Sequence, residues 1–397
     1  MDPLWLLLLL PTAAAGGWVM AKRERRAERR KHLPEAYFKG LSFLLNEQPD
    51  EALRVFLEVV EVDSETVEIH LALGNLFRRR GEIERATRIH QNLVARSDLD
   101  PGLREQALFE LAQDYFKAGL FDRAESLFRE LRRAPDYRAQ ACRFLMQIYD
   151  QEKEWESAIR AAEELARAAG ADMSQPLAHY YCELAEQAIA DGRNARAGRH
   201  IESAFRHDPH CIRAVIQSGR LASMSGNHIN AISIWRGLER WAPQALGEVV
   251  DHVANSYTAL GDGKSYKKFL EDALARNPDA RFIAALVELV SREEKDEAGR
   301  KLLVDLVRRH PSIEGLHELL KSRAASGGGG RENRDFALLA DLLSQVVGQG
   351  RGYHCRTCGF SSNSLHWQCP GCKNWGTVQK RAAAEPLRRA VAMQPPA

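Results

Sequence analysis

Small residues recur 34 positions apart through the middle of this chain. The spacing is met by Gly40 and Gly74, Ala52 and Ala86, Ala124 and Ala158, and Ala197 and Ala231. A fixed period of this length marks a repeat architecture in which each unit is one helix–turn–helix. One such unit cannot bury its apolar face alone, so neighbouring units must stack into an extended superhelix. This period therefore predicts an all-α protein built by stacking helix pairs.

The period is that of tetratricopeptide repeats, and the residues between the small positions fit it. In "LAQDYFKAGLFDRAESLFREL" we expect Ala124 where helices pack closely, Gly119 in the turn and Phe128 in the groove between helices. We predict about eight units over residues 33–311, the last two degenerate, with Tyr266 where a small residue is expected. Such arrays present a concave groove that binds polypeptides, and they rarely catalyse a reaction. The cysteines in the array are expected to fill small core positions: Cys142, Cys182 and Cys211.

Four further cysteines crowd into the stretch "CRTCGFSSNSLHWQCPGC" near the end of the chain. They form two Cys-x-x-Cys pairs, Cys355 with Cys358 and Cys369 with Cys372. Two such pairs can present four thiolates to one ion in a tetrahedron, the arrangement of closed structural zinc sites. Zinc is the first choice, and iron in the same four-sulfur geometry is the alternative. We therefore predict a metal-binding domain over residues 353–380 with no open position for substrate.

This domain is too short to build a core of its own, so the metal would supply its folding energy. We expect Gly359 and Gly371 to adopt the positive-φ backbone that turns amides toward the sulfurs. His354 and His366 are expected in exposed loops, because four cysteines already close the site. The domain also carries four aromatic residues that could cover the cluster, dock on neighbouring helices or face a partner: Tyr353, Phe360, Trp367 and Trp375.

The chain opens with an apolar stretch, residues 4–21, that contains no charged residue. At about 1.5 Å per residue, it is just long enough to cross a thin bilayer. The basic run "KRERRAERRK" follows it, and positive charge stays on the cytoplasmic side of a membrane. We expect a transmembrane anchor at residues 1–21, a basic juxtamembrane segment at 22–32 and a cytoplasmic remainder with reduced thiols. A cleaved signal peptide is the alternative, but its charge would precede the apolar core.

The rest of the sequence contains no convincing catalytic motif. The segment "GDGKS" at 261–265 resembles the end of a phosphate loop, but Thr258 stands where the first glycine is required. The segment "HDPH" at 207–210 fits a turn at the end of a repeat. The formal net charge of +2 is nearly balanced, and no broad basic face is visible. We therefore expect neither enzymatic activity nor nucleic-acid binding.

Two segments flank the four-cysteine domain. Residues 312–352 are predicted to form a helical extension, interrupted by the glycine-rich linker "SGGGGREN". The helix expected after this linker, "RDFALLADLLSQVVG", leads directly into the first cysteine pair. Residues 381–397 have no sustained pattern, so we expect a disordered tail.

The order of these parts resembles the lipopolysaccharide assembly protein B family of Gram-negative bacteria. The resemblance covers nearly the whole chain and is carried by "LLLLLPTAAAGGW", "GLSFLLNEQPDEALRVFLE", "EIHLALGNLFRRRGEIERATRIHQNL", "YHCRTCGF" and "HWQCPGCKNW". It implies that the C-terminal domain is rubredoxin-like. Its metal ligands carry over onto Cys355, Cys358, Cys369 and Cys372.

The resemblance also implies a function and a location. The chain would be a non-enzymatic regulator of lipopolysaccharide synthesis, held in the cell inner membrane by one span with its bulk on the cytoplasmic side. It would link a membrane-bound AAA+ protease to the deacetylase of the lipid A pathway, so that the deacetylase is degraded. The alternative is a scaffold that assembles other lipopolysaccharide synthesis and transport proteins. The sequence leaves open whether the chain forms a homodimer.

Overall fold

A computed structural model describes residues 67–277, 279–294, 296–310, 313–326, 331–349 and 352–380, together with Lys39, Ser42, Phe43 and Glu51. The expected anchor, the basic segment, most of the first repeat and the C-terminal tail lie outside the described residues. Within the described part of the chain, no helix is both long enough and apolar enough to cross a membrane. The chain divides into two compact units, Met1–Ala141 and Cys142–Ala397.

The first unit contains two consecutive helix pairs among its described residues. They are α4 (Val67–Arg79) with α5 (Ile83–Val94), and α6 (Pro101–Lys117) with α7 (Phe121–Leu131). The Asp100 side chain accepts a hydrogen bond from the Gly102 amide, and Pro101 occupies the first turn, so α6 has a well-defined start. Gly119 lies in the turn before α7 with φ of +74°, as expected for a repeat turn.

A buried polar network explains one of the repeated glycines. His90 of α5 and Asp114 of α6 are fully buried, and His90 Nδ1 lies 2.5 Å from Asp114 Oδ2. The Arg78 guanidinium donates to the other oxygen of Asp114 at 2.9 Å. A Cβ atom on Gly74 would lie 2.3 Å from His90 Nε2. The repeat position therefore requires glycine because the imidazole packs directly against the helix backbone.

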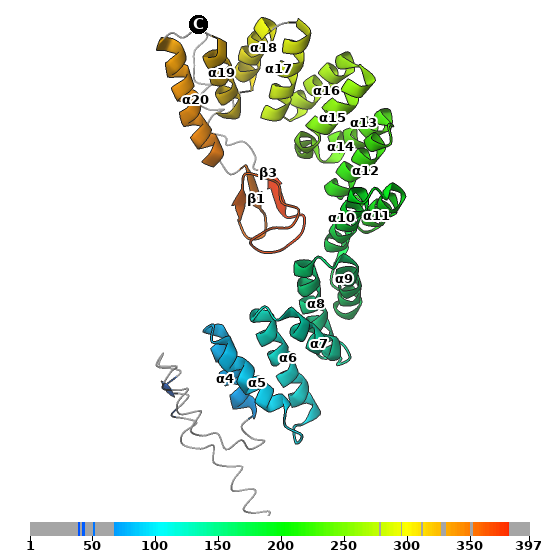
Figure 1. Ribbon diagram of the computed structural model, residues 1–397, viewed down its shortest axis with the longest axis vertical. Coiled ribbons are helices and arrows are strands. Elements are labelled where there is room, and N and C mark those ends of the chain that lie inside the picture. The colour runs from blue at the N-terminus through cyan, green and yellow to red at the C-terminus, as the bar shows by residue number, and fades with distance from the viewer. Residues whose placement is uncertain are drawn as a thin grey trace, which may run out of the picture. The chain divides into compact units, whose positions relative to one another are not determined.

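The helices of the second unit start with α8 (Arg138–Glu152), which begins just before the boundary between the units (Figure 1). Its further helices are α9 (Trp155–Ala169), α10 (Ser174–Ala190), α11 (Asn194–His207), α12 (Ile212–Met224), α13 (His228–Arg236), α14 (Leu238–Trp241), η3 (Pro243–Glu248), α15 (Val250–Leu260), α16 (Gly263–Arg276), α17 (Ala280–Glu294) and α18 (Asp296–Arg309). The helical part of the predicted fold is thus present over the described repeats.

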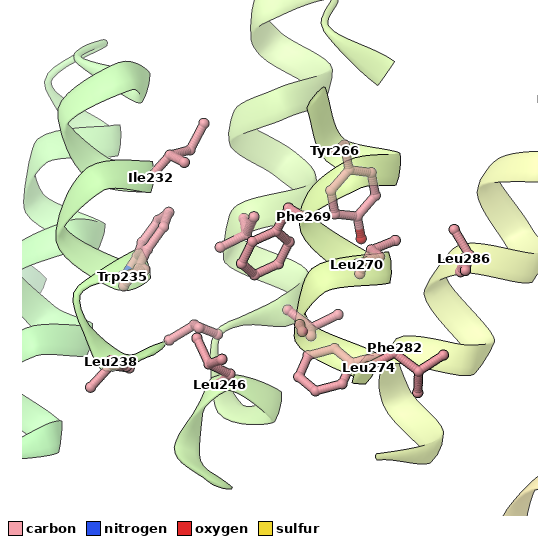
Figure 2. Close-up of a cluster of buried hydrophobic side chains, with 14 of the residues drawn as sticks. Ile232, Trp235, Leu238, Leu246, Tyr266, Phe269, Leu270, Leu274, Phe282 and Leu286 are labelled. Atoms are coloured by element: carbon pink, nitrogen blue, oxygen red, sulfur yellow. The ribbon is translucent and has the colours of Figure 1, made fainter. Parts of the chain in front are cut away.

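The largest apolar core of the second unit runs from α12 to α18. Figure 2 shows part of this core, with labelled side chains from Ile232 to Leu286. Trp235 is buried there, and its indole nitrogen donates to the Ile216 carbonyl oxygen at 3.2 Å. Tyr266, at the position where a small residue was expected, is also buried and packs on Tyr257 with ring centroids 5.6 Å apart. A large ring therefore fills the seventh unit where other units have a small residue.

Two predicted turns can be compared with the structure. Gly261 of "GDGKS" ends α15 with φ of +67°, and the Asp262 side chain caps α16 by accepting from the Ser265 amide at 3.0 Å. This segment is an inter-helix turn, as the sequence predicted, and a helix precedes it in place of the strand that a phosphate loop requires. In "HDPH", the Asp208 side chain accepts from the His210 amide at 2.9 Å in the turn after α11.

The helical extension differs in one respect from the prediction. It consists of α19 (Ile313–Ser326) and α20 (Arg331–Gln349), which pack against each other. Helix α20 begins three residues earlier than expected, so the "REN" part of the predicted linker is helical. Arginine and glutamate are good helix formers, which favours this earlier start.

Candidate metal centre

The four-cysteine domain is built on a small antiparallel sheet in the order β2-β1-β3. The strands are β1 (Tyr353–Cys355), β2 (Ser361–Ser362) and β3 (Val378–Lys380). Because β1 is central, it pairs on one side with β2 and on the other with β3, where Cys355 lies opposite Val378. The first cysteine of the first pair is therefore held by the sheet.

Each Cys-x-x-Cys pair closes a tight turn, but one glycine prediction was wrong. The Gly359 amide donates to the Cys355 carbonyl oxygen at 3.0 Å, and the Lys373 amide donates to the Cys369 carbonyl oxygen at 2.8 Å. The residue that follows each pair has positive φ: Gly359, at +74°, and Lys373, at +60°. Gly371 was expected to have this conformation and does not. A Cβ on Gly371 would lie 3.3 Å from Cys358 Sγ, so its small size serves packing near the sulfurs.

The four cysteine sulfurs come together in one cluster. All lie within 4.8 Å of one another, with Cys355 Sγ 3.7 Å from Cys372 Sγ and Cys358 Sγ 3.6 Å from Cys369 Sγ. Four sulfurs bound tetrahedrally at about 2.3 Å from one zinc ion would be about 3.8 Å apart. The residues present therefore fit a single metal ion, and they suit zinc and iron alike. That these cysteines are the ligands stays a prediction.

The surroundings of the sulfurs also suit a closed metal site. The Thr357 amide donates to Cys355 Sγ at 3.4 Å, and Thr377 Oγ1 lies 3.2 Å from the same sulfur. Only Cys355, Cys369 and Val378 are buried in the apolar cluster of the domain. A core this small supplies little hydrophobic free energy, so an ion cross-linking both pairs would add most of the stability.

Neither nearby histidine belongs to the sulfur cluster. His366 Nε2 lies 3.0 Å from the Ser362 hydroxyl, and the cluster contains cysteines alone. The prediction that His354 lies in an exposed loop was wrong, because it is a half-buried residue of β1 paired with Gln379 of β3. Its place in the sheet follows from strand pairing, which residue type alone did not indicate.

Comparison with known proteins assigns the chain to a family. A rubredoxin metal-binding domain model matches residues 353–380, and a tetratricopeptide repeat model matches 39–101 and 109–174. Lipopolysaccharide assembly protein B of Escherichia coli (strain K12) is 33% identical over 377 residues, 94% of this chain and 97% of the relative. The chain belongs to the lipopolysaccharide assembly protein B family. The protein of that name from Haemophilus influenzae is 31% identical over 391 residues, again 94% and 97% of the two chains.

In this family member the rubredoxin-like domain contacts the repeat array, chiefly through Trp375. The indole is buried against α9 and α10, edge-on to Trp155 and Tyr180 at 6.1 and 5.7 Å between ring centroids. It also stacks on His179 at 5.2 Å. Figure 1 shows β1 and β3 beside this part of the array. Of the three roles left open for the aromatic residues, docking on the helices applies to Trp375.

The other aromatic residues divide between docking and the domain's own core. Trp367 packs against the large apolar core of the array, and the Arg213 guanidinium lies 6.0 Å from its ring centroid. The Tyr353 hydroxyl donates to Glu248 at 2.7 Å, at the end of η3. Phe360 instead packs around the buried cysteines. Three of the four aromatic residues therefore join the domain to the array.

Two carboxylates at this contact hold the domain by hydrogen bonds and charge. Asp150 of α8, which is half-buried, accepts from Gln368 Nε2 at 2.8 Å and from Trp375 Nε1 at 3.4 Å. Asp279, 3% exposed, pairs with Lys380 of β3 at 2.6 Å and with Arg281 at 2.9 Å. Carboxylates withdrawn from water are stable only when hydrogen-bonded or paired, so the domain supplies partners that these two side chains need.

These contacts shift three pKa values in different directions. Burial raises the pKa of Asp150 to about 6, against the opposing effect of the hydrogen bonds from Trp375 and Gln368. Burial also acts to raise the pKa of Asp279, but Arg281 and Lys380 outweigh it and hold the value at about 2. Burial, with the Arg213 charge nearby, lowers the pKa of His179 to about 3. At neutral pH the contact therefore contains a neutral imidazole and two carboxylates.

Proposed function

We propose that this protein regulates lipopolysaccharide synthesis as a non-enzymatic adaptor at the inner membrane. In this proposal it links the deacetylase of the lipid A pathway to a membrane-bound AAA+ protease, which then degrades the deacetylase. The proposal is supported by full-length similarity to proteins named lipopolysaccharide assembly protein B. The structural observation behind it is the docking of a four-cysteine domain on a repeat array built to bind polypeptides.

The metal would act as a structural cross-link in this adaptor. Cys355, Cys358, Cys369 and Cys372 would hold it, and four protein ligands leave no position open for a substrate or water. Among the described residues these cysteines form the one group of three or more metal-binding side chains placed closely enough for an ion. Asp150, His179 and Asp279 would then hold the rubredoxin-like domain on the array. Their contacts would determine the shape of the surface that binds partner proteins.

Attachment to the membrane would make this adaptor efficient. An anchor at residues 1–21, outside the described part of the chain, would confine bound deacetylase to the surface where the protease is embedded. Confinement raises the effective concentration of two partners without any new contact between them. A soluble form lacking residues 1–21 is expected to fold its repeats and to regulate poorly.

The test is the lifetime of the deacetylase after protein synthesis is stopped, in cells depleted of this protein and in cells carrying variants. Depletion and Cys355→Ser should both lengthen the lifetime. Asp150→Ala, which removes the acceptor for Trp375 and Gln368, should do the same. Asp150→Asn keeps an acceptor oxygen and is the matched control with near-normal lifetime.

An unchanged lifetime on depletion would refute the adaptor proposal. Stable complexes with other lipopolysaccharide synthesis or transport proteins would then favour an assembly scaffold. If the deacetylase lifetime is longer on depletion but normal in Cys355→Ser, the adaptor proposal stands. The metal-binding domain would then be dispensable for the adaptor function.

A further inference from the structure

Two cysteines of the array that were expected to be ordinary core residues meet in the second unit. Cys182 lies in the middle of α10, and Cys211 immediately precedes α12. Their sulfurs are 3.9 Å apart, and the residues are 0% and 3% exposed. Apolar residues packed around them include Ala178, Ala185 and Ile201, and the buried Gln217 side chain donates to the Cys182 carbonyl oxygen at 2.9 Å. Adjacent repeats therefore bring together two thiols that are 29 positions apart in the chain.

The two thiols are not equivalent. The contact with Cys182 lowers the pKa of the Cys211 thiol, burial opposes this, and the backbone amide of Ala214 assists it. The same contact and burial raise the pKa of Cys182. Cys211 also stands at the N-terminus of α12, where the helix dipole favours a thiolate. Cys211 is thus the better nucleophile, with the Cys182 thiol in contact with it.

One cysteine of the pair borders a cavity. Cys211 lines a cavity of about 200 Å³ between the array and the rubredoxin-like domain. Ile212 and Gln244 line it from the array, and Leu365 and Trp367 line it from the domain. Cys182 is not among the lining residues and lies behind Cys211. A reagent entering the cavity therefore meets Cys211 first.

We propose that Cys182 and Cys211 form a reversible dithiol–disulfide pair that reacts with peroxides. Cys211 attacks a peroxide oxygen as the thiolate, the O–O bond breaks, and Cys211 sulfenic acid and hydroxide form. Cys182 then attacks the sulfenic sulfur, which closes the disulfide and releases water. Overall, two thiols lose two electrons and two protons, and hydrogen peroxide becomes two molecules of water.

Two thiols of a small reductant reverse the reaction. They attack the disulfide through a mixed disulfide, restore both cysteines and leave as their own disulfide. Transient redox-sensing disulfides of this kind are the usual form in a reducing compartment. Closing the bond requires the sulfurs to move from 3.9 Å to about 2.05 Å, so Cys182 in α10 and Cys211 at the start of α12 must move toward each other.

This movement would change the contact between the array and the rubredoxin-like domain. Arg213, two residues after Cys211, pairs with Glu183 at 2.6 Å, and Glu183 directly follows Cys182. The same guanidinium lies over the Trp367 ring. A disulfide between Cys182 and Cys211 therefore repositions both members of this ion pair, including the guanidinium next to Trp367, and weakens the docking of the domain.

The test uses the full-length, zinc-loaded protein treated with increasing hydrogen peroxide. Remaining thiols are blocked with N-ethylmaleimide, and peptides are mapped without reduction. The expected result is a cross-linked peptide containing Cys182 and Cys211 that forms before zinc is released and disappears after treatment with dithiothreitol. Loss of zinc while both of these cysteines remain free thiols would overturn the proposal.

Variants separate the roles of the two cysteines. Cys182→Ala should leave Cys211 trapped as a sulfenic acid that reacts with dimedone, whereas Cys211→Ala should leave Cys182 unmodified. Cys142→Ala is the matched control from α8 and should form the cross-link normally. Equal dimedone labelling of the two single variants would refute the assignment of Cys211 as nucleophile. If either variant fails to fold, the peptide map of the unmodified sequence still decides the proposal.

The predicted weakening of domain docking on oxidation can be measured without a partner protein. Hydrogen exchange of residues 353–380 is compared in the reduced, oxidised and re-reduced protein. Oxidation should speed exchange in this domain at least about tenfold, the change that follows from a docking equilibrium weakened by about 1.4 kcal/mol. Re-reduction should restore the slow rate. A disulfide that forms without changing this exchange would overturn the coupling to docking.

Discussion

Gln368 Nε2 of the rubredoxin-like domain donates a hydrogen bond to Asp150 Oδ2 in α8 at 2.8 Å, across 218 positions of sequence. The same oxygen accepts from Trp375 Nε1. We predict that Asp150→Ala weakens docking by about 1–3 kcal/mol, because the buried indole N–H loses its acceptor. Hydrogen exchange of residues 353–380 measures the effect directly, since undocking exposes this domain.

Asp150→Asn is the control for that prediction. Its side-chain oxygen can still accept from both donors, while the negative charge is removed. We expect docking within about 1 kcal/mol of the unmodified protein. If the Asn and Ala variants exchange equally fast, the carboxylate charge, and not its acceptor geometry, would hold the domain.

Removing the metal should unfold the rubredoxin-like domain and leave the repeat helices folded. A strong chelator, or Cys355→Ser, should make exchange of residues 353–380 fast, because the domain has only a small apolar cluster of its own. The repeat helices have independent cores and should keep their helical circular dichroism. Returning zinc should restore protection in the chelated protein. Slow exchange of the metal-free domain would contradict the view that the ion supplies its folding energy.

The buried imidazole of His179 predicts acid sensitivity. Its pKa is about 3 in the folded state and 6.5 in the ordinary case, so the unfolded state binds the proton first as the pH falls. Stability should therefore decrease between pH 6.5 and 3, by up to about 1.4 kcal/mol per pH unit. Asp150 has the opposite effect on stability. Its raised pKa makes the folded state bind a proton first, so its contribution to the free energy of unfolding increases as the pH falls from about 6 to 4.

The two effects can be separated by working in the Asp150→Asn variant. In that background, adding His179→Phe keeps a ring against Trp375 and removes the titration of the imidazole. Unfolding free energies are measured in urea from about pH 7 to pH 4. They should fall more steeply in the protein that retains His179 than in the protein that also carries the His179→Phe substitution, in which burial still lowers the pKa values of His200 and His252. Equal slopes would mean that groups other than this imidazole set the acid response.

The sequence predicted those features that depend on residues near one another in the chain. The 34-residue period predicted the helix pairs, and the cysteine spacing predicted the cluster of sulfurs. It did not predict the partners of Trp375, because Asp150 and His179 lie in ordinary helical segments and reach the indole only through the stacking of repeats. The meeting of Cys182 with Cys211 was missed for the same reason. The positive φ of Lys373 was missed because residue type favours glycine there.

The repeated glycines give a last prediction about the array itself. A Cβ on Gly219 of α12 would lie 2.1 Å from Trp235 Nε1, in a core where this indole is 1% exposed. Gly219→Ala should therefore destabilise the protein by about 1–3 kcal/mol, despite the better helix propensity of alanine. Gly198 of α11 is the matched control, because its Cβ would meet only Leu221 Cδ2, at 3.7 Å. Gly198→Ala should be neutral or stabilising by up to about 1 kcal/mol in urea unfolding. Equal stability of the two variants would mean that Trp235 does not pack against the α12 backbone.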